Sequence, residues 1–179
     1  MKHNYYTDFI NFFKKHNLYD EEIFNYINKN STRFEYDNEE LIPFIGCYYI
    51  KNSQDILQKI KLYVPYITNQ ITVLINIHEY IHAIELYKKI GKKFKEDNLK
   101  EILPMLYERI YIKENPSKKL EEHLKFLNKK INENSTESYK IALEIQDELL
   151  DYYNTQNPKL RMLQTKAKKI SKKYQRSNQ

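Results

Sequence analysis

Glycine and proline are scarce in this sequence, with only two glycines and five prolines in 179 residues. A β-sandwich or β-barrel needs many turn residues, so this scarcity argues against both and favours helices. Tryptophan is absent, and the single cysteine, Cys47, excludes an internal disulfide and a cysteine-based zinc cluster. The remaining composition is globular, with 41% hydrophobic and 30% charged residues, which is sufficient for one domain with a buried core.

Long apolar runs are missing as well. The longest, residues 64–77, is interrupted by Pro65, Asn69 and Gln70 and is shorter than the roughly 20 residues that span a bilayer. The first eight residues contain no apolar stretch of signal-peptide length. We therefore expect a soluble, cytoplasmic protein that does not span a membrane.

Acidic residues are missing from the C-terminal end. From Tyr152 onward all charged residues are basic, whereas the part before it is slightly acidic, so the net charge of +6 comes from this end. A segment of this kind is usually a solvated helix end. We expect residues 158–179 to form a basic C-terminal helix or tail, and this distribution does not favour nucleic acid as the main partner.

Hydrophobic spacing predicts an α+β protein that is mostly helical. Residues 41–50 and 56–66 are rich in β-branched and aromatic side chains and are expected to pair as a short antiparallel hairpin or sheet, and a further short strand is compatible with 33–36. Residues 68–90 are apolar on all sides, which predicts a buried central helix under this sheet. The remaining helices, two N-terminal and four C-terminal, are expected at 4–16, 20–28, 98–113, 118–131, 136–153 and 158–174.

The central helix carries the motif His78-Glu79-Tyr80-Ile81-His82. Histidines four residues apart project from one face of a helix, so both imidazoles can reach one ion. Glu79 points to the neighbouring side, where a carboxylate can take a proton from a metal-bound water. Zn²⁺ suits this set because it accepts imidazole and carboxylate ligands and leaves one position for water.

The ordinary alternative is a helix face whose histidines and glutamate make hydrogen bonds or meet solvent. The flanking residues 75–77 and 83–84 are uncharged, and polar groups without partners are costly in such surroundings. A bound metal explains their presence better than chance does.

The third protein ligand must come from outside the motif. Metzincins place a histidine or aspartate six residues after the second histidine, but Lys88 is there in this chain. A carboxylate of the next helix is expected instead, and Glu101, Glu108 and Glu114 are available. Glu101 and Glu108 are seven residues apart, hence two turns along the same face, and their spacing leaves open which of them binds the metal.

The stretch from Glu101 to Glu108, Glu-Ile-Leu-Pro-Met-Leu-Tyr-Glu, resembles the second metal-site helix of gluzincin metallopeptidases related to thimet oligopeptidase and oligoendopeptidase F. The likeness covers about residues 70–112, and in size the chain is nearer to the minigluzincins, without the long helical clamshell of the large oligopeptidases. This resemblance implies one zincin-like domain over residues 1–157 and a peptide or protein substrate. It further implies Glu101 as the third zinc ligand and Glu108 as a hydrogen-bond partner of a ligand histidine.

An active peptidase also needs a donor for the developing oxyanion. Tyr139 is the candidate, with Tyr152, Tyr153 and His123 as alternatives. A di-iron bundle would require a second Glu-x-x-His pair, which the sequence lacks. The other interpretation is a non-catalytic or latent zincin-fold protein that acts as a regulatory or binding module, contacting an acidic partner or nucleic acid through its basic tail. The oligomeric state has no signature in the sequence.

Overall fold

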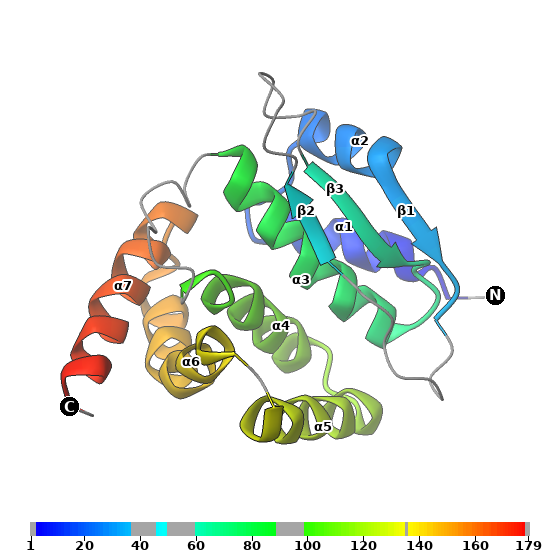
Figure 1. Cartoon of the computed structure of the whole chain (residues 1–179). Helices are drawn as coiled ribbons and strands as arrows, with labels where there is room; N and C mark the ends of the chain where they lie inside the picture. The colour runs from blue at the N-terminus through cyan, green and yellow to red at the C-terminus, as the bar shows by residue number, and fades with distance from the viewer. Residues whose placement is uncertain (1–2, 37–45, 50–59, 89–98, 135, 178–179) are drawn as a thin grey trace. The chain divides into compact units, whose positions relative to one another are not determined.

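The computed structural model describes residues 3–36, 46–49, 60–88, 99–134 and 136–177 (Figure 1). The chain forms two compact units, residues 1–89 and residues 90–179. The predicted division into 1–157 and 158–179 differs from this one and stays a prediction. The elements of the first unit are α1 (Tyr5–Lys15), α2 (Glu21–Asn30), β1 (Ser31–Phe34), β2 (Gly46–Tyr49), β3 (Ile60–Pro65) and α3 (Gln70–Tyr87), and those of the second are α4 (Ile102–Glu114), α5 (Lys118–Asn134), α6 (Glu137–Gln156) and α7 (Leu160–Ser177).

The mostly helical class with a small sheet is confirmed. Each predicted helix has a counterpart whose ends differ by a few residues, which is the usual uncertainty of helix ends. The largest difference at a start is in α4, which begins at Ile102 and not at residue 98. Glu101 is therefore the N-cap residue of α4, and its side chain makes no capping hydrogen bond.

The sheet has three strands in the order β1-β3-β2. β2 pairs antiparallel with β3, with Gly46 opposite Tyr63; the turn of the predicted hairpin lies in 50–59, outside the described residues. β1 pairs parallel with β3, with Ser31 opposite Leu62. The expectation of a purely antiparallel sheet was therefore wrong. Alternation along a strand indicates which face is buried but not which distant strand lies beside it. β1 and β3 are not consecutive in sequence, since β2 lies between them.

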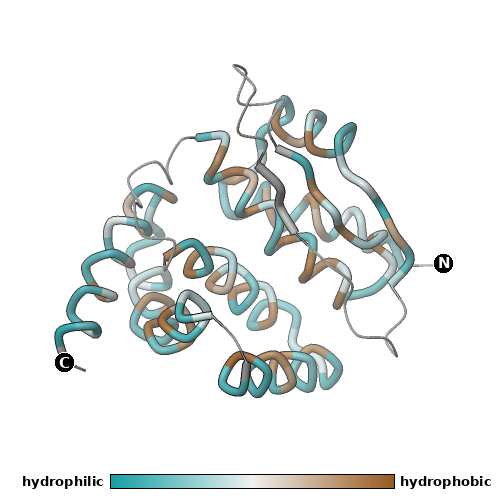
Figure 2. The backbone as a smooth tube through the Cα atoms, viewed as in Figure 1, coloured by the Kyte–Doolittle hydropathy of each residue, from teal (hydrophilic) through white to brown (hydrophobic). Residues whose placement is uncertain are grey.

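The core of the first unit is built around α3, which contacts the sheet and both N-terminal helices. Side chains on all sides of α3 are buried, which confirms the prediction of a helix without a polar face; in Figure 2 the α3 tube carries many hydrophobic residues. The ring of Tyr80 lies 4.8 Å from that of Phe9 and 5.1 Å from that of Phe24, centroid to centroid. Such aromatic pairs each add about 0.5–1.5 kcal/mol beyond their buried area, so α1 and α2 are held to α3.

A capping box fixes the start of α3. The Asn69 side chain accepts hydrogen bonds from the backbone N–H groups of Ile71 at 2.9 Å and Thr72 at 3.0 Å. Thr72 Oγ1 in turn accepts from the backbone N–H of Asn69 at 3.0 Å. These reciprocal bonds satisfy N–H groups that the helix itself leaves without partners, and they set the position from which the motif residues are counted.

In the second unit, α6 contacts α4, α5 and α7. The buried side-chain amide of Gln146 on α6 donates to the backbone carbonyl of Ile102 at 3.1 Å, which ties α6 to the first turn of α4. α7 is amphipathic, with Leu163, Ala167 and Ile170 buried and a largely hydrophilic remainder (Figure 2). Among the described residues no helix combines the length and hydropathy that crossing a bilayer requires.

Candidate metal centre on α3

The two histidines of the motif converge. His78 and His82 are one turn apart on α3, and their Nε2 atoms lie 3.2 Å from each other. The ring centroids are 4.9 Å apart and the ring planes are inclined by 71°. His78 is only 8% exposed, and His82 is half-buried. The predicted convergence of the two imidazoles is thus present within the first unit.

This separation fits two ligands of one zinc ion. Zinc–nitrogen bonds of about 2.0–2.1 Å in tetrahedral geometry place two ligand nitrogens about 3.3 Å apart. The observed 3.2 Å matches that edge of the tetrahedron. A direct hydrogen bond between a donor and an acceptor imidazole has a similar length, so the distance is compatible with both arrangements and the metal content of the protein distinguishes them.

Glu79 follows His78 and is buried, with 7% of its surface exposed. Successive residues of an α-helix are rotated by about 100°, so Glu79 projects beside the histidine face and not along it. This is the position from which a carboxylate can receive a proton near the ion without being a ligand itself.

The remaining predicted site residues belong to the second unit. Glu101 is the N-cap residue of α4 and is 4% exposed. Glu108 lies on the same helix, two turns further on, and is half-buried. Tyr139 is half-buried in the first turn of α6, where its backbone N–H donates to the carbonyl of Thr136 at 3.1 Å. Their assigned roles stay predictions.

α4 is buried on two sides. Met105 and Ile112, which follow Glu101 along its face, are buried, and so are Leu103 and Leu106 on the other side. A helix of this kind can support a ligand carboxylate, because its backbone position is fixed by packing over its whole length.

Glu108 has an electrostatic partner within its own unit. Burial lowers the pKa of the His123 imidazole, and the negative charge of Glu108 partly opposes this by raising that pKa. The resemblance assigned Glu108 to a ligand histidine, whereas the described interaction joins it to His123 on α5.

A polar network on the other side of α3 was not predicted. The Arg33 guanidinium of β1 donates through Nη1 to the side chain of Asn76 and through Nη2 to Tyr80 Oη at 3.1 Å. Asn28 Oδ1 accepts from Arg33 Nη2 at 3.3 Å and also from Tyr80 Oη. Burial raises the pKa of Tyr80 to about 12, although the Arg33 charge lowers it. Arg33 belongs to a polar stretch of sequence, and no motif marks it.

In the comparison with known proteins, no protein-family model, no curated protein and no solved structure matches the chain.

Proposed function

We propose that this protein is a zinc-dependent peptidase whose metal is held by His78, His82 and Glu101. The observation that carries the proposal is the 3.2 Å separation of the two Nε2 atoms on a buried helix. Two imidazoles and one carboxylate form a ligand set used by catalytic zinc sites, which keep a fourth position open. Zinc bound there would supply an acidified water and a Lewis acid for the scissile carbonyl.

Glu79 is the proposed general base. Its carboxylate is adjacent in sequence to His78 and is buried, so few competing waters surround it. It would accept the proton of the attacking water and then donate that proton to the leaving amine.

Glu101 is the proposed third ligand. It is buried at the start of a helix whose position is fixed by packing and by the hydrogen bond from Gln146 to Ile102. Tyr139 is the proposed donor to the developing oxyanion. Glu108 is the proposed hydrogen-bond partner of a ligand histidine, and its interaction with His123 competes with that role.

The test combines metal analysis with a digest of mixed peptides. Purified wild type is expected to contain zinc at one equivalent and to cleave peptides. Glu79→Gln keeps the zinc and loses cleavage by about 10²- to 10⁴-fold, the usual contribution of a general acid or base. His78→Ala and Glu101→Ala lose most of the metal.

Three matched variants sharpen this experiment. Glu108→Gln keeps the zinc if Glu101 is the ligand. If Glu108→Gln loses the metal and Glu101→Ala keeps it, Glu108 is the ligand instead. Tyr139→Phe slows cleavage, whereas Tyr152→Phe on the same helix does not. Zinc-free wild type after reconstitution with ZnCl₂ would contradict the whole proposal.

A second candidate function rests on α7. Lys169, Lys172, Lys173 and Arg176 line a surface pocket of about 430 Å³, and no acidic residue follows Asp151. Under this proposal a latent or non-catalytic zincin-fold protein uses the cationic helix to bind an acidic protein or nucleic acid. Three results together would favour this function. The purified protein contains no zinc, it binds a DNA oligonucleotide with an affinity that falls steeply with salt, and the double variant Lys169→Glu/Lys172→Glu does not bind the oligonucleotide.

A further inference from the structure

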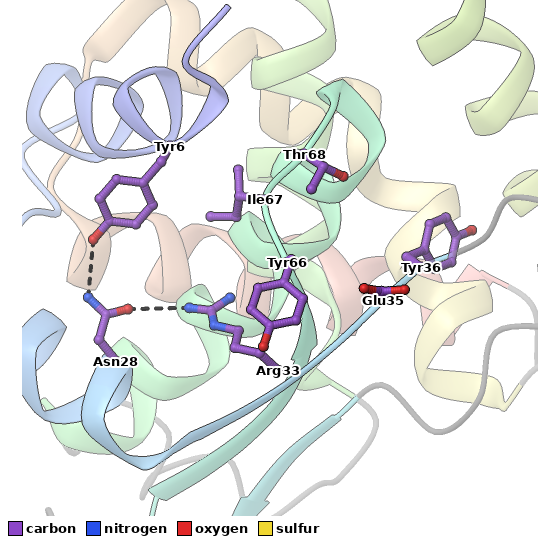
Figure 3. A pocket seen from close by; sticks show the side chains of 8 residues that line it. All are labelled: Tyr6, Asn28, Arg33, Glu35, Tyr36, Tyr66, Ile67 and Thr68. Atoms are coloured by element: carbon purple, nitrogen blue, oxygen red, sulfur yellow. Dashed lines mark hydrogen bonds between the residues drawn. The ribbon is translucent and has the colours of Figure 1, made fainter. Parts of the chain in front are cut away.

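A second pocket lies in the first unit, with a volume of about 850 Å³. It is lined by polar side chains from α1, α2, β1 and the segment that joins β3 to α3 (Figure 3). This volume is typical of small-molecule sites. The lining residues are Tyr6, Asn28, Arg33, Glu35, Tyr36, Tyr66, Ile67 and Thr68.

This pocket is separate from the histidine pair. Arg33 reaches Asn76 and Tyr80, which are both two residues before a motif histidine on α3. Residues two apart on a helix are about 200° apart, so Asn76 and Tyr80 lie on the face nearly opposite to His78 and His82. Through Arg33 the pocket is therefore connected to a side of α3 that the proposed zinc chemistry does not use.

Arg33 brings a positive charge to the pocket, and the described residues supply no carboxylate that pairs with it. Its four Nη–H groups donate to the carbonyl of Pro65, to Asn76, to Asn28 and to Tyr80. All four acceptors are uncharged, and among the described residues Arg33 forms no ion pair. The Nε–H, the fifth donor of the group, has no acceptor among the described residues, so the site attracts an anionic group and offers it a hydrogen bond.

Glu35 brings a negative charge to the same pocket. It is exposed, lies two residues beyond Arg33, and makes no ion pair within the described part of the chain. In Figure 3 Arg33 is drawn toward Asn28 and Glu35 toward Tyr36, so the two charges stand at different parts of the pocket. A phosphate or other polyanion would be repelled by Glu35, whereas a ligand with both charges is suited to the pair.

The short stretch of chain between the two charged residues indicates a small ligand. Two residues along an extended chain place their Cα atoms about 6.6 Å apart, so a ligand that reaches both side chains is short. An extended dipeptide has a length of about 7 Å, with an ammonium at one end and a carboxylate at the other. The phenol rings of Tyr6, Tyr36 and Tyr66 supply apolar faces for its side chains, and burial raises the pKa of Tyr36, which keeps that hydroxyl a hydrogen-bond donor.

We propose that this pocket binds a zwitterionic dipeptide, with the terminal carboxylate at Arg33 and the terminal ammonium at Glu35. The inference depends on the pocket alone. It does not require zinc at His78 and His82 or peptidase activity.

Calorimetric titration with alanylphenylalanine tests the proposal, because the ligand can be altered without changing the protein. The N-acetylated dipeptide and the dipeptide amide each lack one charge, and both are expected to bind at least about tenfold more weakly than the free dipeptide. Glu35→Gln is expected to weaken the free dipeptide about tenfold and to leave the N-acetylated form unchanged. Glu22→Gln, which removes an exposed carboxylate on α2, is the matched control.

Several outcomes would overturn this assignment. Equal affinity for free and capped dipeptides would show that the two terminal charges are not recognised. Absence of binding heat with alanylphenylalanine at millimolar concentration would show that the pocket does not bind a dipeptide. Unchanged affinity of Glu35→Gln for the free dipeptide would show that Glu35 does not bind the terminal ammonium. His78→Ala is expected to bind alanylphenylalanine as the wild type does, so the zinc proposal and this one fail independently.

Discussion

His78 Nε2 and His82 Nε2 lie 3.2 Å apart on one face of α3. Without an ion, one ring must donate and the other accept at this distance, so the two rings hold different tautomers. With an ion on both Nε2 atoms, each ring carries its proton on Nδ1. The two states therefore differ in a property that nitrogen NMR detects directly.

Zinc is expected to stabilise the wild-type protein. A ligand at about 100 times its Kd raises the free energy of unfolding by about 2.7 kcal/mol if it binds only the folded state. Thermal unfolding with ZnCl₂ and with EDTA measures this difference, which disappears in His82→Ala. The exposed His3 gives the control, since His3→Ala should respond as the wild type does. An unchanged zinc response in His82→Ala would remove that histidine from the ligand set.

The capping box is expected to contribute to the stability of the first unit. Asn69→Ala removes the acceptor of two backbone N–H groups at the start of α3 and should cost about 1 kcal/mol in urea unfolding. Asn69→Asp retains an acceptor and should stay close to the wild type, as should Asn132→Ala at an exposed position of α5. If Asn69→Ala were as stable as Asn132→Ala, the observed bonds would contribute nothing.

Alkaline pH is expected to destabilise the protein through Tyr80. Burial raises its pKa from 10.0 to about 12, so the unfolded chain loses this proton above pH 10 while the folded protein retains it up to about pH 12. The stability from this group is present below pH 10 and is lost as pH rises toward 12, by about 1.4 kcal/mol at pH 11. Urea unfolding at pH 8 and pH 11 should show a smaller loss of stability in Tyr80→Phe than in Tyr66→Phe, since Tyr66 is 52% exposed. Equal losses in the two variants would argue against a raised pKa.

The imidazole of His123 is expected to titrate below its ordinary pKa of 6.5, because burial disfavours its charged form. The unfolded chain then binds this proton first, so His123 contributes stability above pH 6.5 that is lost as pH falls below 6.5 toward its folded pKa. An NMR titration should give a still lower pKa in Glu108→Gln, because the Glu108 charge raises it. Glu144→Gln at an exposed site of α6 is the control, and a rise in Glu108→Gln would contradict the pairing.

Local patterns predicted most of the helices because each depends on residues three and four apart. The buried character of α3 followed from the distribution of apolar residues alone. The convergence of His78 and His82 was predictable for the same reason, since helical geometry fixes it within one turn.

The features that sequence did not predict depend on distant partners. The parallel pairing of β1 with β3 and the bonds of Arg33 to Asn76 and Tyr80 join segments more than 25 residues apart, and no spacing rule covers such pairs. Nothing in the motif marks Tyr80, which stands between the two histidines, yet its hydroxyl accepts from Arg33 and donates to Asn28. The N-cap position of Glu101 was also missed, because helix starts are the least regular part of a helix.

One consequence follows from α3 presenting histidines on one face and the partners of Arg33 on the other. Arg33 joins the pocket to one face of α3, and the proposed zinc ligands His78 and His82 lie on the other face. If alanylphenylalanine changes the affinity for zinc by some factor, zinc must change the affinity for the dipeptide by that same factor. One coupling factor, measured with either ligand, therefore describes the effect of one site on the other.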